Sequence, residues 1–134
     1  TAVKANPLRA LDLRPEHLAV IKEALVGVNK EGTGARAFAG AEYVSAGKTG
    51  TAQVIGIKQG EKYVESRVQE RHRDHALFIA YAPAENPKIA LAVVVENTGF
   101  GARYAAPIAR QVLDFYLLGK RPAPPKRGKD DEDG

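Results

Sequence analysis

The sequence has 134 residues, of which 44% are apolar and 27% charged, an ordinary balance for a folded domain that argues against global disorder. It contains no cysteine, which excludes a cysteine nucleophile, a disulfide framework and a zinc finger. The formal charge of +4 comes from short charged segments and not from one amphipathic face, so no nucleic-acid partner is expected.

The first predicted element is a helix over residues 15–29. Pro15 suits its first turn, and Gly32 and Gly34 predict its end and the start of a loop. Its apolar residues recur at helical spacing, at Leu18, Ile21, Leu25 and Val28. No run of about 18 apolar residues follows anywhere, so no membrane-spanning segment is expected within this sequence.

Three strands are predicted next. The first covers residues 41–57 and contains three glycines, which in a strand often mark the close approach of a ligand or another backbone. The charged segment 58–75 is predicted to be a loop with a short helical turn near 65–71. The strands at 76–82 and 89–95 are apolar on both faces, which predicts burial, and their short Pro- and Asn-containing linker predicts an antiparallel pair.

A second helix is predicted after the strands. Pro107 is assigned to its first turn and Gly119 to its C-terminal cap. Its apolar stripe consists of Ala105, Ile108, Ala109, Val112, Phe115 and Tyr116. Residues 120–134 are rich in proline, then basic, then acidic, and are predicted to be a disordered charged tail, which leaves residues 1–119 as the structured part.

This order of elements predicts an α+β fold, with an antiparallel sheet and flanking helices. Two strands that are apolar on both faces need cover on both sides of the sheet, and two helices supply little of it. The sequence therefore predicts a part of a larger domain.

The segment Ser45-Ala-Gly-Lys-Thr-Gly-Thr-Ala-Gln53 carries the chemistry. On a strand, Thr49 and Thr51 point to the same side, and Gly50 between them leaves room for a ligand against the backbone. With the ammonium group of Lys48, they suit a carboxylate-bearing substrate that binds as an added strand. Alone, Lys-Thr-Gly is a short motif found in penicillin-binding proteins and class A β-lactamases.

The longer pattern is more specific. Residues 46–54, 70–83 and 87–97 closely resemble the penicillin-binding protein 2 family, the class B transpeptidases of bacterial cell elongation, and the resemblance extends over roughly 16–118. It implies the C-terminal part of the transpeptidase fold shared with serine β-lactamases. It also implies a peptidoglycan D,D-transpeptidase that cross-links stem peptides by serine acyl transfer, binds β-lactams and uses no cofactor or metal.

The resemblance also implies roles for individual residues. Lys48 would hold the proton network and attract the substrate, and the hydroxyls of Thr49 and Thr51 would bind the terminal carboxylate of a D-Ala-D-Ala stem peptide or a β-lactam. Gly50 would belong to the same binding strand, and the Thr51 N–H would be an oxyanion-hole donor. The implied partners are the rest of the transpeptidase domain and the cell-elongation machinery, at the periplasmic face of the inner membrane through an upstream anchor.

The sequence departs from the family in one respect. The family needs a nucleophilic serine with a lysine one helical turn later, and a Ser-x-Asn motif, but the serines here are Ser45 and Ser66 and no Ser-x-Asn occurs. Ser45-Ala-Gly-Lys48 fits the string, yet residues three apart on a strand face opposite sides. We therefore expect a C-terminal segment that is inactive alone. A non-catalytic binding or scaffold module of the same fold is the alternative.

Other motifs are weaker. Gly47-Lys-Thr49 matches the end of a phosphate loop, but Glu42 stands where the first glycine belongs and no helix is predicted to follow. His72-Arg-Asp74 resembles a kinase catalytic loop, but Ile79 replaces the expected asparagine. His72 and His75 have no evident third metal ligand, so a surface loop is the better interpretation. A plain edge strand, with a lysine that discourages aggregation, is the non-functional interpretation of Lys-Thr-Gly.

Overall fold

The computed structural model describes residues 12–56, 64 and 68–122. The elements follow one another as α1 (Pro15–Lys30), α2 (Ala35–Phe38), β1 (Ala46–Ala52), the 3-10 helix η2 (Glu70–His72), β2 (His75–Ala82), β3 (Ile89–Val95) and α3 (Gly101–Leu118). None of the helices in these ranges is long and apolar enough to cross a membrane.

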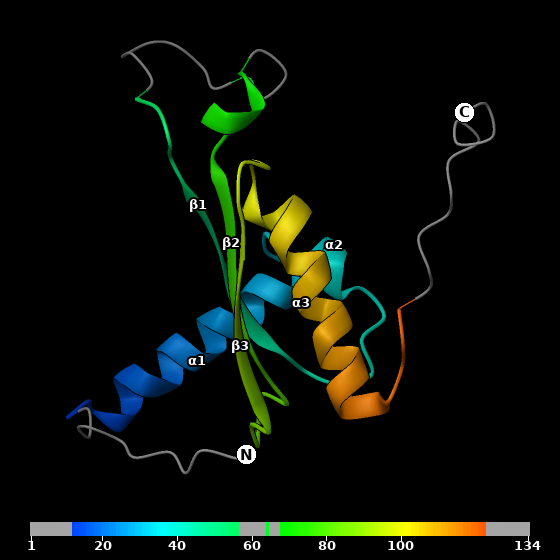
Figure 1. Ribbon diagram of the computed structural model, residues 1–134. Coiled ribbons are helices and arrows are strands. Elements are labelled where there is room, and N and C mark those ends of the chain that lie inside the picture. The colour runs from blue at the N-terminus through cyan, green and yellow to red at the C-terminus, as the bar shows by residue number, and fades with distance from the viewer. Residues whose placement is uncertain (1–11, 57–63, 65–67, 123–134) are drawn as a thin grey trace, which may run out of the picture.

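The three strands form one antiparallel sheet in the order β1-β2-β3. Figure 1 shows this sheet edge-on, with α3 along one side of it and α1 crossing near β1. The register places Thr49 of β1 opposite Phe78 of β2, and Phe78 opposite Val93 of β3. The predicted α+β class and antiparallel pairing are confirmed.

The core lies between α3 and one face of the sheet. Every second residue of β2 is buried there, because side chains alternate between the two faces of a strand. The buried residues are mostly small, so the helix and the sheet approach closely: Ala76, Phe78, Ala80 and Ala82 meet Ala105, Ala106, Ala109 and Leu113. The ring of Phe38 in α2 stacks on Phe78 with 5.8 Å between centroids, which adds α2 to this layer.

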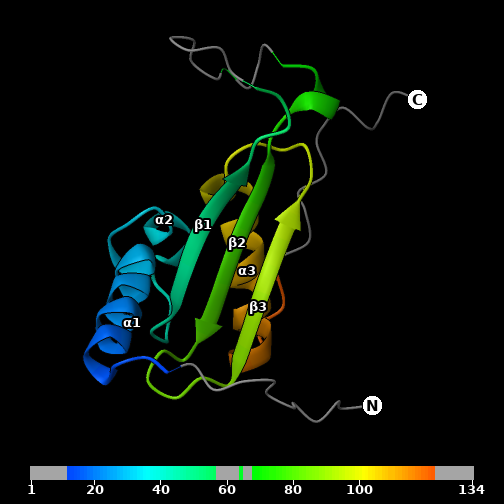
Figure 2. The same ribbon diagram turned by 90° about the vertical axis from the view of Figure 1, so that its left-hand side faces the viewer.

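The other face of the sheet is largely uncovered by the described residues. Ile79 is 55% exposed and Val94 is 60% exposed, and both point away from α3. Figure 2 looks onto this face and shows α1 beside β1, with the middle of the sheet open. The strands at 76–82 and 89–95 were predicted to be buried, but within the described residues only alternate residues of β2 are buried and none of β3 is. The predicted need for cover on both faces is met on one face by the described part of the chain.

Helix α1 confirms the predicted helix but not the burial of its apolar stripe. Leu18 and Ile21 are exposed, and the buried residue of this helix is Asn29 near its C-terminal end. Helical spacing of apolar residues identifies a helix, but the neighbours of that helix decide which side is buried.

Helix α3 corrects two predictions. It begins at Gly101, so Pro107 lies inside the helix and not in its first turn. Of the predicted stripe only Ala105 and Ala109 are buried, with Ala106 and Leu113 beside them, whereas four larger residues are more than a third exposed: Ile108, Val112, Phe115 and Tyr116. The buried face is the one with small residues, because these allow the helix to lie close to the sheet. Gly119 caps the helix in the left-handed conformation, as predicted.

The remaining boundaries differ as follows. The strand predicted over 41–57 extends only over Ala46–Ala52, the stretch that pairs with β2. Helix α2 was not predicted, and the helical turn expected near 65–71 is η2 at Glu70–His72. Much of the predicted loop, Ser66 and residues 123–134 of the predicted tail lie outside the described residues.

Candidate active-site strand

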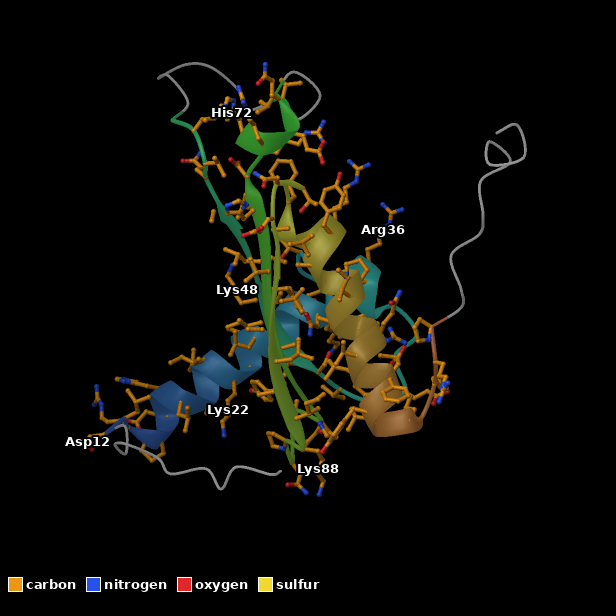
Figure 3. The ribbon with its side chains drawn as sticks, in the orientation of Figure 1. Asp12, Lys22, Arg36, Lys48, His72 and Lys88 are labelled. Atoms are coloured by element: carbon orange, nitrogen blue, oxygen red, sulfur yellow. The ribbon has the colours of Figure 1, made fainter. Side chains whose placement is uncertain are left out.

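All four predicted site residues lie on β1, at an edge of the sheet. Lys48 is opposite Ile79 and so lies on the uncovered face, where Figure 3 shows it pointing away from α3. Thr49 and Thr51 are opposite Phe78 and Ala76, on the face that α3 covers. The ammonium group and the two hydroxyls therefore leave the strand on opposite faces, and a ligand could reach both only along the outer edge of β1.

The side chain of Lys48 folds back along its own strand. Its Nζ donates a hydrogen bond to the carbonyl oxygen of Thr49 at 2.8 Å, and the side chain is exposed. Alternate residues of an antiparallel strand direct their backbone N–H and C=O groups to the same side. The contact indicates that the N–H and C=O groups of Thr49 point away from β2. By the same alternation, those of Thr51 also point away from β2.

The hydroxyl of Thr49 also has a partner. Its Oγ1 lies 2.9 Å from Oγ1 of Thr33, which is in the loop between α1 and α2. Thr33 was not among the residues predicted from the sequence. A hydroxyl residue between Gly32 and Gly34 is visible in the sequence, but nothing there indicates that this loop lies beside β1.

Gly50 has a structural reason to lack a side chain. Gly101, the first residue of α3, lies so close that a Cβ atom on it would overlap the carbonyl oxygens of Gly50 and Leu77. A Cβ atom on Gly50 itself would lie 3.1 Å from Cβ of Leu77. The glycine was predicted to make room for a ligand. In the structure it makes room for the side chain of Leu77 on the neighbouring strand, and the missing side chain of Gly101 lets α3 begin close to the backbone of Gly50.

Ser45 does not have the surroundings of an activated nucleophile. It is 5% exposed, and its hydroxyl oxygen accepts a hydrogen bond from Nδ2 of Asn29 at 2.9 Å. The ammonium group of Lys48 bonds to the Thr49 carbonyl instead. A base that receives the serine proton must lie within hydrogen-bond reach of the hydroxyl. These contacts support the interpretation of Ser45-Ala-Gly-Lys48 as a chance match.

The two histidines do not share a helix. His72 ends η2, whereas His75 begins β2 and accepts a hydrogen bond on its Nδ1 from the backbone N–H of Asn97 at 3.0 Å. Within the described ranges, no group of three or more His, Cys, Asp or Glu side chains comes together in a way that could hold a metal ion.

A cluster of hydrogen-bonded polar side chains joins the segment before β1 to α3. Tyr43 donates a hydrogen bond from its hydroxyl to Asp114 at 2.8 Å, and Asp114 also accepts from Nε of Arg110. Nη1 of Arg110 reaches the carbonyl oxygens of Ala37 and Ala39. Burial, and next the hydrogen bond to Asp114, raise the pKa of Tyr43 well above its ordinary value. These residues were not predicted, because they are 71 positions apart along the chain.

Comparison with known proteins decides the family. The profile of the "penicillin binding protein transpeptidase domain" matches residues 2–114. The chain belongs to the penicillin-binding protein transpeptidase family. A Haemophilus influenzae "peptidoglycan D,D-transpeptidase MrdA" is 50% identical over 91 residues, which cover 68% of this chain and 14% of that protein. The chain thus spans about a seventh of this relative.

Solved structures of transpeptidases agree with this assignment. The structure of Pseudomonas aeruginosa PBP2 in complex with WCK 5153 has a TM-score of 0.69 and 38% identity, and the match covers 91% of this chain and 25% of that one. A complex between PBP2 and MreC from Helicobacter pylori has a TM-score of 0.60 and 28% identity, over 78% of this chain and 18% of that one. The resemblance to the penicillin-binding protein 2 family is confirmed.

Proposed function

We propose that this chain supplies the Lys-Thr-Gly strand of a peptidoglycan D,D-transpeptidase, which cross-links stem peptides by serine acyl transfer and is acylated by β-lactams. The observation that carries the proposal is Lys48-Thr-Gly-Thr51 on an edge strand. A cation and two hydroxyls lie there beside a backbone edge that pairs with no other strand of the described residues. Similarity to peptidoglycan D,D-transpeptidases supports the choice of reaction.

The proposed mechanism assigns one task to each residue. The substrate lies along the outer edge of β1 as an added strand, with its terminal carboxylate at the hydroxyls of Thr49 and Thr51. The backbone N–H of Thr51 donates to the oxyanion of the tetrahedral intermediate. Lys48, on the opposite face of the strand, supplies positive charge to the proton network of the nucleophile. The serine that forms the ester comes from a part of the protein outside these 134 residues, because Ser45 is buried and bonded to Asn29 and Ser66 has no lysine three positions later in the sequence.

The same proposal includes partners and location. The uncovered sheet face, with Ile79 and Val94, receives the nucleophile-bearing part of the transpeptidase domain, because an exposed apolar sheet face needs cover. Similarity to the PBP2 of the PBP2–MreC complex supports a role in the cell-elongation machinery. We place the active protein at the periplasmic face of the inner membrane, held by an anchor upstream of this chain. We propose that residues 1–119 belong to the transpeptidase domain and that residues 120–134 form a charged tail.

Substitution of the strand residues in the longer protein that carries this chain tests the proposal. Thr49→Val removes one hydroxyl at nearly constant shape, so carboxylate binding should weaken by about 1.5–3 kcal/mol. Lys48→Ala should slow acylation further, because it removes the charge. The measurement is the rate of acylation by a labelled penicillin, with Val20→Ala on the exposed side of α1 as a matched control. Wild-type rates for both Thr49→Val and Lys48→Ala would show that this strand is not the substrate site.

A non-catalytic binding or scaffold module is the second candidate function, because the described residues contain no activated serine. The same labelling experiment separates the two. A longer protein that binds penicillin reversibly, without a covalent adduct, would favour the binding module.

A further inference from the structure

We propose that Thr33 is a positioning residue: it donates its hydroxyl proton to Oγ1 of Thr49 and thereby directs the Thr49 proton toward the substrate carboxylate. The two oxygens are 2.9 Å apart, and the geometry allows either one to donate. The inference rests on the proposed function, in which Thr49 binds a carboxylate.

The direction of the bond follows from the number of protons. Each threonine hydroxyl has one proton to donate and lone pairs that accept. A carboxylate only accepts, so Thr49 must give its single proton to the ligand. Thr49 can then bond to Thr33 only as an acceptor, which makes Thr33 the donor. A hydroxyl that accepts one hydrogen bond is also polarised as a donor of the next.

The loop that carries Thr33 is fixed in place beside β1. The N–H groups of Gly32 and Gly34, on either side of Thr33, donate to the carbonyls of Gly27 and Val28 at 2.9 Å each. Asn29, at the end of α1, is buried and bonded to Ser45, just before β1.

The loop and the strand are thus joined at two points, Asn29 to Ser45 and Thr33 to Thr49. Both pairs are separated by 16 positions along the chain. Glycine at position 47 leaves room for this arrangement, because a Cβ atom there would lie 3.1 Å from Nδ2 of Asn29. Thr33 is therefore held at one place relative to Thr49, as a positioning residue must be.

The charge on this side of β1 suits a carboxylate. Thr33 lines a groove of about 760 Å³ whose charged lining residues are Arg36 and Arg103. Two arginines in the groove that Thr33 lines favour the approach of an anion from this side. Lys48 lies on the other face of the strand, so the groove adds positive charge where the motif itself has none.

A double-mutant cycle in the longer protein tests the inference. Thr33→Val should slow acylation by a labelled penicillin about three- to tenfold, the effect of one hydrogen bond between uncharged groups. In a Thr49→Val background the same substitution should change the rate by less than about twofold, because Thr33 then has no hydroxyl to orient. Thr33→Ser should restore most of the wild-type rate.

Several results would overturn the inference. An equal loss in both backgrounds would mean that Thr33 acts through the fold alone. A faster rate for Thr33→Val would mean that Thr49 donates to Thr33 and that the bond competes with the substrate. No effect of Thr33→Val, with a clear effect of Thr49→Val, would reject the role of Thr33 and leave the proposed function intact. No effect of Thr49→Val would reject the role of Thr49 in carboxylate binding, on which the inference rests, and no effect of either Thr49→Val or Lys48→Ala would reject the proposed function itself.

The controls concern folding. Thermal unfolding of each variant should match the wild type, because Thr33 is exposed. Should Thr33→Val destabilise the protein, Thr33→Ser and Thr33→Ala differ only in the hydroxyl group and keep the comparison decisive.

Discussion

In the proposed function, individual residues of β1 have a role in the fold as well as in ligand binding. Gly50 leaves room for the side chain of Leu77. The carbonyl of Thr49 accepts a hydrogen bond from Lys48, and the hydroxyl of Thr49 is bonded to that of Thr33. Small or hydroxyl-bearing residues suit this double task, because they leave space for neighbours and still present polar groups at the strand edge. Substitutions on this strand must therefore be judged by folding as well as by activity.

The oxyanion role proposed for Thr51 leads to a prediction at this scale. Thr51→Pro removes the backbone N–H, whereas Thr51→Ala removes only the side-chain hydroxyl. Loss of one oxyanion-hole donor typically slows acyl transfer about 100- to 1000-fold. In the longer protein we expect that loss for Thr51→Pro and a much smaller one for Thr51→Ala, measured as penicillin acylation rates. Circular dichroism should confirm that both variants are folded. A folded Thr51→Pro variant with a normal rate would rule out the oxyanion role.

Among the elements, α3 organises the others. It covers one face of the sheet, and its first residue, Gly101, lies against the backbone of Gly50. The hydrogen bond from Tyr43 to Asp114 joins the segment before β1 to the helix. Arg110 extends this contact to the carbonyls at the end of α2. Both ends of the strand that carries Lys-Thr-Gly are therefore fixed by one helix.

The bond between Tyr43 and Asp114 predicts a dependence on alkaline pH. The pKa of Tyr43 is raised above its ordinary value of 10.0, so the folded state favours the protonated phenol. This contribution to stability is fully present below about pH 10 and is lost as the pH rises above it, because the unfolded state then releases the proton more readily. We expect Tyr43→Phe to lower the free energy of unfolding near neutral pH by about 1.5–3 kcal/mol, the effect of a lost hydrogen bond to a charged group.

Between about pH 9 and pH 11, across the ordinary tyrosine pKa, the wild type should lose more stability than Tyr43→Phe does. Urea unfolding of the longer protein at each pH measures the difference. Tyr116→Phe is the matched control, because Tyr116 is on the exposed side of α3. Identical pH profiles for the wild type and Tyr43→Phe would show that this hydrogen bond does not stabilise the protonated form.

At the scale of the whole molecule, the main feature is a sheet with one covered face. Ile79 and Val94 project from the other face, and four larger apolar residues of α3 are also more than a third exposed. Exposed apolar areas of this kind commonly mark surfaces where another part of a protein binds. The surfaces agree with a chain that spans 14% of its Haemophilus influenzae relative.

These 134 residues alone should form no covalent adduct with penicillin. Ser45 is buried, its hydroxyl is bonded to Asn29, and Lys48 is bonded to the carbonyl of Thr49. Ser66 has no lysine three positions later in the sequence to act as its base. The test is the intact mass of the isolated chain after incubation with excess penicillin. Addition of the preceding part of the transpeptidase domain as a separate chain should restore labelling, on a serine of that part. An adduct that maps to Ser45 would mean that the isolated chain is a self-sufficient enzyme and would contradict the proposed origin of the nucleophile.

The sequence by itself determined the kind of each main element and the place of the candidate active-site strand. Continuous apolar runs and helical spacing depend only on neighbouring residues, so α1, β2, β3 and α3 were predicted from local pattern. The motif Lys48-Thr-Gly-Thr51 is contiguous, so its residues and its family were visible without a structure. The geometry of a strand was also enough to place Thr49 and Thr51 on one face.

Only the tertiary structure decided which surfaces meet. The sequence does not indicate that Thr33 lies beside Thr49, that Asn29 binds Ser45, or that Gly101 rests on Gly50. Nor does it show that the buried side of α3 is the one with alanines, since the larger apolar residues give the stronger pattern. These contacts join positions 16 to 51 residues apart, and such pairs depend on how the chain as a whole packs, which no local pattern encodes.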